Sequence, residues 1–118
     1  MYEYNAECVR VIDGYTLDAM IDLGFSTWKR VRIRLDGIDT SSSITKNKDK
    51  KYKAKERLEE IVDLNDNKFH LKVNSIGKYG KAFGEVLVSN VGRSAEDSSI
   101  TMCNVNNQLI KEGYVVGN

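Results

Sequence analysis

Hydrophobic and polar residues alternate along the first third of the chain. Leu17, Ala19 and Ile21 share one parity, and mostly polar residues occupy the positions between them. A period of two is typical of a strand with one buried face. Similar alternation before and after this segment predicts three consecutive antiparallel strands. They cover residues 4–12, 16–23 and 28–36.

Short turns separate these strands. Asp13-Gly14 lies between the first two, and we expect a tight turn there because glycine accepts a positive φ. Residues 24–27 begin with Gly24 and join the second strand to the third. The three strands and two turns therefore fit a meander.

The period changes after a polar segment at residues 41–50. Ala54, Leu58 and Ile61 recur at the spacing i, i+4, i+7, and charged residues fill most of the other positions. This spacing predicts an amphipathic helix over residues 51–64.

Alternation returns beyond this helix and predicts strands at residues 69–73 and 82–89. A second helix is expected to begin after Asn104, a favourable N-cap residue. It should end at Gly113, which suits a left-handed position just past a helix.

The predicted elements follow the order β-β-β-α-β-β-α. Five strands with a helix between the third and the fourth are the order of an OB-fold barrel, so we expect an α+β, mainly β fold. A chain of 118 residues has room for one core, which predicts a single domain over residues 1–118. Many OB-folds bind nucleic acids, but a fold alone does not decide a function.

The composition, 41% hydrophobic and 30% charged, is that of an ordinary folded domain. Without a long apolar run or a leader-like N-terminus, we expect a cytoplasmic protein. Cys8 and Cys103 form no C-x-x-C motif and are expected to be free thiols. With His70 as the single histidine, a zinc site or a hydrolytic triad is a poor interpretation.

The charge is unevenly distributed, although the net charge is only +1. Residues 46–57 carry seven Lys or Arg against two Asp or Glu. Such a patch indicates a partner that bears phosphates, while a solvated helix face would have the same composition.

Four short motifs occur in a fixed order along the chain. They are Val11-Ile12-Asp13-Gly14-Tyr15-Thr16, Arg34-Leu35-Asp36-Gly37-Ile38-Asp39-Thr40, Lys78-Tyr79-Gly80-Lys81 and residues 105–113. In this combination the chain resembles the thermonuclease family, whose founding member is staphylococcal nuclease. The resemblance covers about residues 7–115, and it implies the same OB-fold barrel that the periodicity predicts.

The resemblance implies a calcium-dependent phosphodiesterase that acts on DNA and RNA. In that chemistry oxygen ligands hold the cation, a glutamate activates water, and two arginines bind the phosphate. By resemblance, Asp39 matches one metal carboxylate and Thr40 the ligand that uses its main-chain carbonyl. Arg34 matches the first arginine. Lys78 and Tyr79 match positions beside the bound nucleotide.

Several positions depart from the family pattern. Tyr15 stands where the family has its other metal carboxylate, and Ser42 stands where it has the glutamate. Lys81 replaces the second arginine, so the charge is kept but the bidentate fork is lost. Ser41 replaces the proline that precedes the glutamate.

These departures are large in energetic terms. A general base contributes roughly 10²–10⁴ in rate, and a lost oriented charge donor costs about 3–4 kcal/mol. The contributions are not additive, because such residues act as a unit. Their combined loss still predicts that catalysis is absent or very weak, and that calcium binding is weak or absent.

The leading hypothesis is a degenerate nuclease, a monomer, that still binds single-stranded DNA or RNA. Tyr79 would stack against a base, and cations would contact the backbone. These cations are Arg34, Lys46, Lys48, Lys50, Lys51, Lys78 and Lys81.

Two other hypotheses stay open. An active calcium-dependent nuclease would need a rearranged metal site, to which Asp13 or Asp36 could contribute. Asp18 has the opposite parity from Tyr15 along its strand and should point away. In the third hypothesis the barrel has been repurposed as a protein-interaction module.

Overall fold

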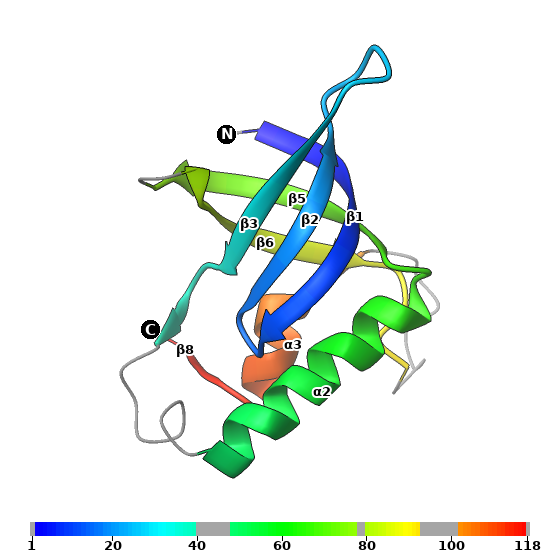
Figure 1. Ribbon diagram of the computed structural model, residues 1–118. Helices are drawn as coiled ribbons and strands as arrows, with labels where there is room; N and C mark the ends of the chain where they lie inside the picture. The colour runs from blue at the N-terminus through cyan, green and yellow to red at the C-terminus, as the bar shows by residue number, and fades with distance from the viewer. Residues whose placement is uncertain (1, 40–47, 78–79, 93–101, 118) are drawn as a thin grey trace.

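The computed structural model (Figure 1) describes residues 2–39, 48–77, 80–92 and 102–117. The strands are β1 (Tyr2–Asp13), β2 (Thr16–Asp22), β3 (Trp28–Leu35), β4 (Ile38–Asp39), β5 (Lys68–Ile76), β6 (Ala82–Val88), β7 (Cys103–Asn104) and β8 (Val116–Gly117). The helices are α2 (Lys48–Leu64) and α3 (Val105–Lys111). The order confirms the predicted β-β-β-α-β-β-α arrangement, to which β4, β7 and β8 are short additions.

Five strands close into a barrel (Figure 1). They are hydrogen-bonded in the order β3-β2-β1-β5-β6, and β6 also pairs with β3. The β3–β6 pair is parallel, with Ile33 opposite Ala82, whereas the other barrel pairs are antiparallel. The closure confirms the OB-fold, and it brings the end of β3 next to the start of β6.

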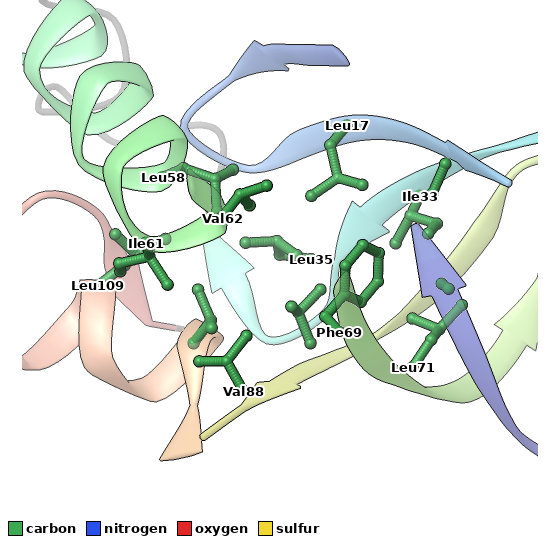
Figure 2. Packing of buried hydrophobic residues seen from close by; sticks show 14 of the residues in the cluster. Leu17, Ile33, Leu35, Leu58, Ile61, Val62, Phe69, Leu71, Val88 and Leu109 are labelled. Atoms are coloured by element: carbon green, nitrogen blue, oxygen red, sulfur yellow. The ribbon is translucent and has the colours of Figure 1, made fainter. Parts of the chain in front are cut away.

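The alternating apolar residues of the strands fill this barrel. Leu17 and Ile33 have no exposed surface, and Leu35 and Leu71 have almost none. Figure 2 shows these side chains directed into one core together with Phe69. Each strand therefore has an inward apolar face and an outward face available to solvent or a partner.

Both helices pack against the barrel. Leu58, Ile61 and Val62 are the buried apolar side chains of the second half of α2, and Ile61 lies beside Leu109 of α3 (Figure 2). The i, i+4, i+7 spacing predicted this face, although α2 begins at Lys48, three residues earlier than expected.

Residues 46–57 do not form one solvated basic patch, because Arg57 is buried. Its side chain is 2% exposed and lies between α2, α3 and the chain after β6. Its Nε donates to Glu112 at 2.6 Å, and its Nη2 donates to the carbonyl of Val91 at 2.9 Å. Arg57 is therefore a structural residue, because its charge is already paired inside the protein.

Gly14 is required at the β1–β2 turn because of a close contact and not, as expected, because of a positive φ. It does not have a positive φ, unlike Gly24. A Cβ at this position would lie 2.4 Å from the Cβ of Ala54 in α2. Glycine is needed because the turn lies directly against the helix.

The limits of α3 are confirmed. The Asn104 side chain accepts a hydrogen bond from the backbone N–H of Asn107, as an N-cap does. Gly113 has a φ of +81°, and its N–H donates to the carbonyl of Ile110. Both features follow from the local sequence.

No helix of the described ranges is long and apolar enough to cross a membrane. The assignment of residues 1–118 to a single domain stays a prediction.

Candidate functional site

A pocket of about 200 Å³ lies where the β1–β2 turn meets the end of β3 and the start of β6. We call it the cationic pocket. Its lining includes Asp13, Tyr15, Thr16, Arg32, Arg34 and Lys81. Three larger cavities, of about 590, 610 and 260 Å³, contain none of the described residues that the sequence predicts for the site. The cationic pocket is therefore the candidate site.

The guanidinium group of Arg34 lies over the ring of Tyr15, 5.3 Å from its centroid. Two backbone relationships fix this arrangement. Thr16 pairs with Arg34 across β2 and β3, and the N–H of Leu35 donates to the carbonyl of Tyr15 at 2.8 Å. The phenol thus stands beside Arg34, where it contributes a cation–π contact and no carboxylate.

Lys81 reaches the same pocket from a distant part of the sequence. It directly precedes β6, whose first residue Ala82 pairs with Ile33. Ile33 lies between Arg32 and Arg34 on β3, so barrel closure brings three cationic residues together. The sequence placed Arg34 and Lys81 in one site by resemblance, and the structure brings them into one pocket.

Arg32 is a pocket residue that sequence reasoning missed. Its Nε donates to Oδ1 of Asp18 at 2.9 Å, and its Nη2 donates to Oδ2 at 3.3 Å. These hydrogen bonds are the main cause that lowers the pKa of Asp18, although burial acts in the opposite direction. Asp18 does not itself line the pocket, but the prediction that it points away from the site is wrong, because it contacts the pocket residue Arg32 and shares its parity with Thr16, which lines the pocket. The alternation of arginines at positions 30, 32 and 34 was the sequence signal that could have placed Arg32 on the same face as Arg34.

Asp13 supplies a carboxylate to the pocket. Its Oδ1 accepts a hydrogen bond from the backbone N–H of Tyr15 at 2.9 Å. This bond is typical of a turn aspartate. Because the side chain also lines the cationic pocket, Asp13 is placed to influence whatever binds there.

Asp36 lies just beyond the end of β3 and serves the turn to β4. Its Oδ1 accepts from the N–H of Gly37, its Oδ2 accepts from the Asn74 amide at 3.0 Å, and its own N–H donates to Gly84. It is not among the residues that line the cationic pocket. Of the two acids considered as extra ligands, the structure brings only Asp13 to the pocket.

Asn106 links the end of β3 to β6, next to the strands that carry the site, and was also missed. Its side chain is buried, and its Nδ2 donates to the carbonyls of Asp36 at 2.8 Å and Gly84 at 3.0 Å. Its Oδ1 accepts from the N–H of Val86 at 3.2 Å. The amide therefore holds the end of β3 against β6.

Asp39 lies in β4, half-buried, and pairs with Val116 of β8. It is not among the described residues that line the cationic pocket. The other predicted positions of this region and of the Lys-Tyr-Gly motif lie outside the described residues. These are Thr40, Ser41, Ser42, Lys46, Lys78 and Tyr79.

Lys48, Lys50 and Lys51 occupy the first turn of α2 and are exposed. The close approach of Gly14 to Ala54 places this helix beside the β1–β2 turn. The three lysines therefore belong to a helix that packs against the β1–β2 turn, which also lines the cationic pocket.

The described lining of the cationic pocket does not fit a calcium ion. Calcium takes six to eight oxygen ligands, with carboxylates foremost. The lining offers the carboxylate of Asp13 and places three cationic side chains beside it. Within the described ranges, no group of three or more His, Cys, Asp and Glu is arranged to hold a metal. The predicted roles of Asp39, Thr40 and Tyr15 at a metal stay predictions.

Comparison with protein families relates most of the chain to a known family. The family model described as Staphylococcal nuclease homologue matches residues 32–117. The match begins at Arg32, later than the resemblance about residues 7–115 suggested, and it includes Arg34, Asp39 and Lys81. No curated protein matches the sequence.

Proposed function

The chain belongs to the family of staphylococcal nuclease homologues, and from this premise we propose that it binds single-stranded DNA or RNA at the cationic pocket, with phosphodiesterase activity that is absent or very weak. The single observation that carries the proposal is the convergence of Arg32, Arg34 and Lys81 around one small pocket.

Binding follows from the chemistry of this lining. Two guanidinium groups and one ammonium group on neighbouring strands match the charge of a phosphodiester backbone. The ring of Tyr15 supports Arg34 and limits the directions that its guanidinium group can take. Lys48, Lys50 and Lys51 add longer-range attraction that salt should screen.

Weak catalysis follows from the side chains that the family uses and this chain lacks. By resemblance, Tyr15 replaces a metal carboxylate, Ser42 replaces the glutamate that activates water, and Lys81 replaces an arginine. A serine hydroxyl is no general base without a base of its own. Calcium binding is accordingly proposed to be weak or absent, and no step of the proposed function depends on it. A cytoplasmic location and a monomeric state stay predictions.

Fluorescence anisotropy with a labelled single-stranded oligonucleotide tests the binding. We expect weak to moderate affinity at low salt, and a fall in affinity as salt is added. The double variant Arg34→Gln/Lys81→Gln should lose at least tenfold in affinity. The matched control is Lys68→Gln/Lys111→Gln, which removes the same charge at exposed sites away from the pocket. Equal losses in both variants, or no binding by the parent protein at low salt, would refute the proposal.

Restoration of the family residues tests the catalytic part. Tyr15→Asp, Ser41→Pro, Ser42→Glu and Lys81→Arg are introduced together, and cleavage of a quenched fluorescent oligonucleotide is followed with calcium or with a chelator. We expect calcium-dependent cleavage to rise well above that of the parent protein. Adding Asp39→Ala should abolish the gain and controls for contaminating nuclease. Strong cleavage by the parent protein itself would contradict the degenerate assignment.

One observation favours a second candidate, an active nuclease with a rearranged metal site. Asp13 presents a carboxylate to the same pocket as Arg34. This candidate predicts chelator-sensitive cleavage by the parent protein that is lost in Asp13→Asn. The same assay with calcium, magnesium and manganese separates the two candidates.

A further inference from the structure

The outward face of β3 carries a continuous row of cationic side chains that ends at the cationic pocket. Arg30, Arg32 and Arg34 alternate with the inward residues Val31, Ile33 and Leu35. Their cross-strand partners on β2 are Met20, Asp18 and Thr16. The side chains of Arg30 and Arg32 are 56% and 46% exposed. The row is therefore accessible along the strand.

An exposed aromatic side chain stands at the far end of this row. Trp28 has the same parity as the three arginines, and 47% of its surface is exposed. It begins β3 beside the β2–β3 hairpin, which projects from the barrel (Figure 1). We call Trp28, Arg30, Arg32 and Arg34 together the arginine track.

We propose that the arginine track carries a single-stranded nucleic acid from the cationic pocket along the outer face of β3 to Trp28. The inference rests on the proposed function, because it extends the ligand bound at the pocket. The arginines would contact successive phosphates, and the indole ring would stack on a base beyond them. A single-stranded nucleic acid is flexible, and it carries a negative phosphate at each step and bases that can stack. A row of cationic side chains that leads to an exposed aromatic ring matches both features.

Asp18 holds part of the arginine track in place. It is buried and accepts hydrogen bonds from both Arg32 and Arg30, the latter at 3.4 Å. One carboxylate shared by two guanidinium groups leaves a net positive charge, and it aligns both groups along the sheet. Donors that are aligned before binding lose less entropy when the ligand arrives.

The acidic side chains on the same face of the sheet do not cancel the positive charge of the arginine track. Asp22, opposite Trp28, accepts the N–H of Gly24 and so closes the hairpin turn. Glu7 lies on β1, on the far side of Met20 from Arg30. Arg10, opposite Asp18 on β1, adds a further exposed cation. A ligand on β3 therefore meets more positive than negative charge.

The length of the arginine track sets the size of the ligand. Trp28 and Arg34 are six residues apart on an extended strand, which is roughly 20 Å. OB-folds cover about 4–16 nucleotides each. An oligonucleotide of eight nucleotides should reach from the cationic pocket to Trp28, whereas a dinucleotide should occupy the pocket alone.

The test compares a labelled dinucleotide and an octanucleotide, both measured by anisotropy. For the parent protein we expect the octanucleotide to bind at least tenfold more tightly. Arg30→Gln should remove most of this gain and lower the salt slope for the octanucleotide by about 0.7, the value for one phosphate contact with a single strand. Asp18 keeps both hydrogen bonds from Arg32 in this variant, so the fold should be retained.

Trp28 offers a second, independent readout. It is the single tryptophan of the chain, so its fluorescence reports on this position alone. The octanucleotide should quench it and the dinucleotide should not. Trp28→Ala should cost roughly tenfold in octanucleotide affinity, and Trp28→Phe should restore most of the loss.

Lys29→Gln is the matched control for Arg30→Gln. Lys29 is exposed on the same strand, but it faces the mouth of the barrel beside Ile21 and Val73. The Lys29→Gln variant should bind the octanucleotide more tightly than the dinucleotide by the same factor as the parent protein. Dinucleotide binding without any gain from length overturns the arginine track and leaves the proposed function standing, whereas loss of binding by both ligands overturns the two together. Equal competition by an acidic peptide at the same charge concentration would assign the track to a protein partner and also overturn it.

Discussion

Arg57 combines a full charge with almost complete burial. Its guanidinium group contacts Glu112, Glu60 and the carbonyl of Val91, and the side chain of Glu112 is itself 12% exposed. Glu112 is the largest cause that raises the pKa of Arg57. A buried ion pair of this kind adds little net stability, but removing Glu112 leaves the buried guanidinium group with the exposed Glu60 as its remaining acidic partner among these contacts.

Glu112→Gln should therefore lower the free energy of unfolding by about 3–5 kcal/mol. The control is Glu60→Gln, which removes the exposed partner of Arg57 and should cost no more than about 1 kcal/mol. Urea denaturation followed by circular dichroism measures both values. Equal effects of the two substitutions would mean that burial does not govern this network.

Asp18 should make stability depend on pH. Its pKa in the folded protein lies below the ordinary value of 3.8, chiefly because Arg32 donates hydrogen bonds to the carboxylate. The unfolded chain then binds the proton more tightly, so the contribution is complete above about pH 4 and is lost as the pH falls through the folded pKa. Asp18→Asn should be less stable than the parent protein at pH 7, and the difference should shrink below pH 4. A difference that stays constant from pH 7 to pH 2.5 would contradict this assignment.

At the scale of elements, the contact between the β1–β2 turn and α2 fixes the position of the cationic pocket. The added Cβ of an alanine at Gly14 would lie 2.4 Å from the Cβ of Ala54 and 3.1 Å from its carbonyl carbon. The helix and the turn must then separate, and Tyr15 is the next residue in the chain.

Gly14→Ala should accordingly destabilise the protein by about 1–3 kcal/mol through overpacking. Ala54→Gly alone should cost about 1 kcal/mol of helix propensity. The double variant should be more stable than the sum of the two costs implies, because the clash between the two Cβ atoms is gone. A double-mutant cycle by thermal denaturation measures this coupling, and strict additivity would disprove the contact.

Asn106 joins three elements, α3, β6 and the turn after β3. Asn106→Leu keeps the volume but leaves the N–H of Val86 and the carbonyl of Asp36 without this partner. Buried groups that lose their partners cost about 1–3 kcal/mol each, so we expect a loss of about 3 kcal/mol in the free energy of unfolding. Asn107→Ala, on the exposed face of the same helix, should change stability by less than about 0.5 kcal/mol. A loss from Asn106→Leu no larger than that of the control would show that the amide is dispensable.

At the scale of the whole molecule, ligand binding and folding are linked. A ligand that binds the folded barrel alone raises the free energy of unfolding by about 2.7 kcal/mol at a hundredfold excess over its Kd. A single-stranded octanucleotide should therefore raise the Tm of the parent protein and of Lys68→Gln/Lys111→Gln alike. Arg34→Gln/Lys81→Gln binds at least tenfold more weakly, so at the same oligonucleotide concentration its stabilisation should fall to about 1.4 kcal/mol or less, seen as a smaller rise in differential scanning fluorimetry. A rise of equal size in that variant would place the ligand elsewhere on the molecule.

Much of the fold could be predicted because its signals are local. The alternation around Leu17 and Ile33, the helical spacing of Leu58 and Ile61, and the cap at Asn104 each depend on neighbouring residues alone. The candidate site was predicted less completely. The order of the motifs predicted Arg34 and Lys81 as site residues. It did not predict Arg32, Asp18 and Asn106, because these residues act through partners that are distant in the sequence.

By itself, the sequence determined the order of the elements, the family and the side-chain types at each motif position. The hydrophobic period of a strand or helix and the preference for a capping residue are properties of short segments. They are therefore the same however the rest of the chain is arranged. Only the tertiary structure decided that Arg57 is buried beside Glu112, that Gly14 lies against Ala54, and that barrel closure brings Lys81 to Arg34. These facts depend on which distant strands pair and on where each helix packs, and no local pattern of hydrophobic and polar residues encodes such contacts.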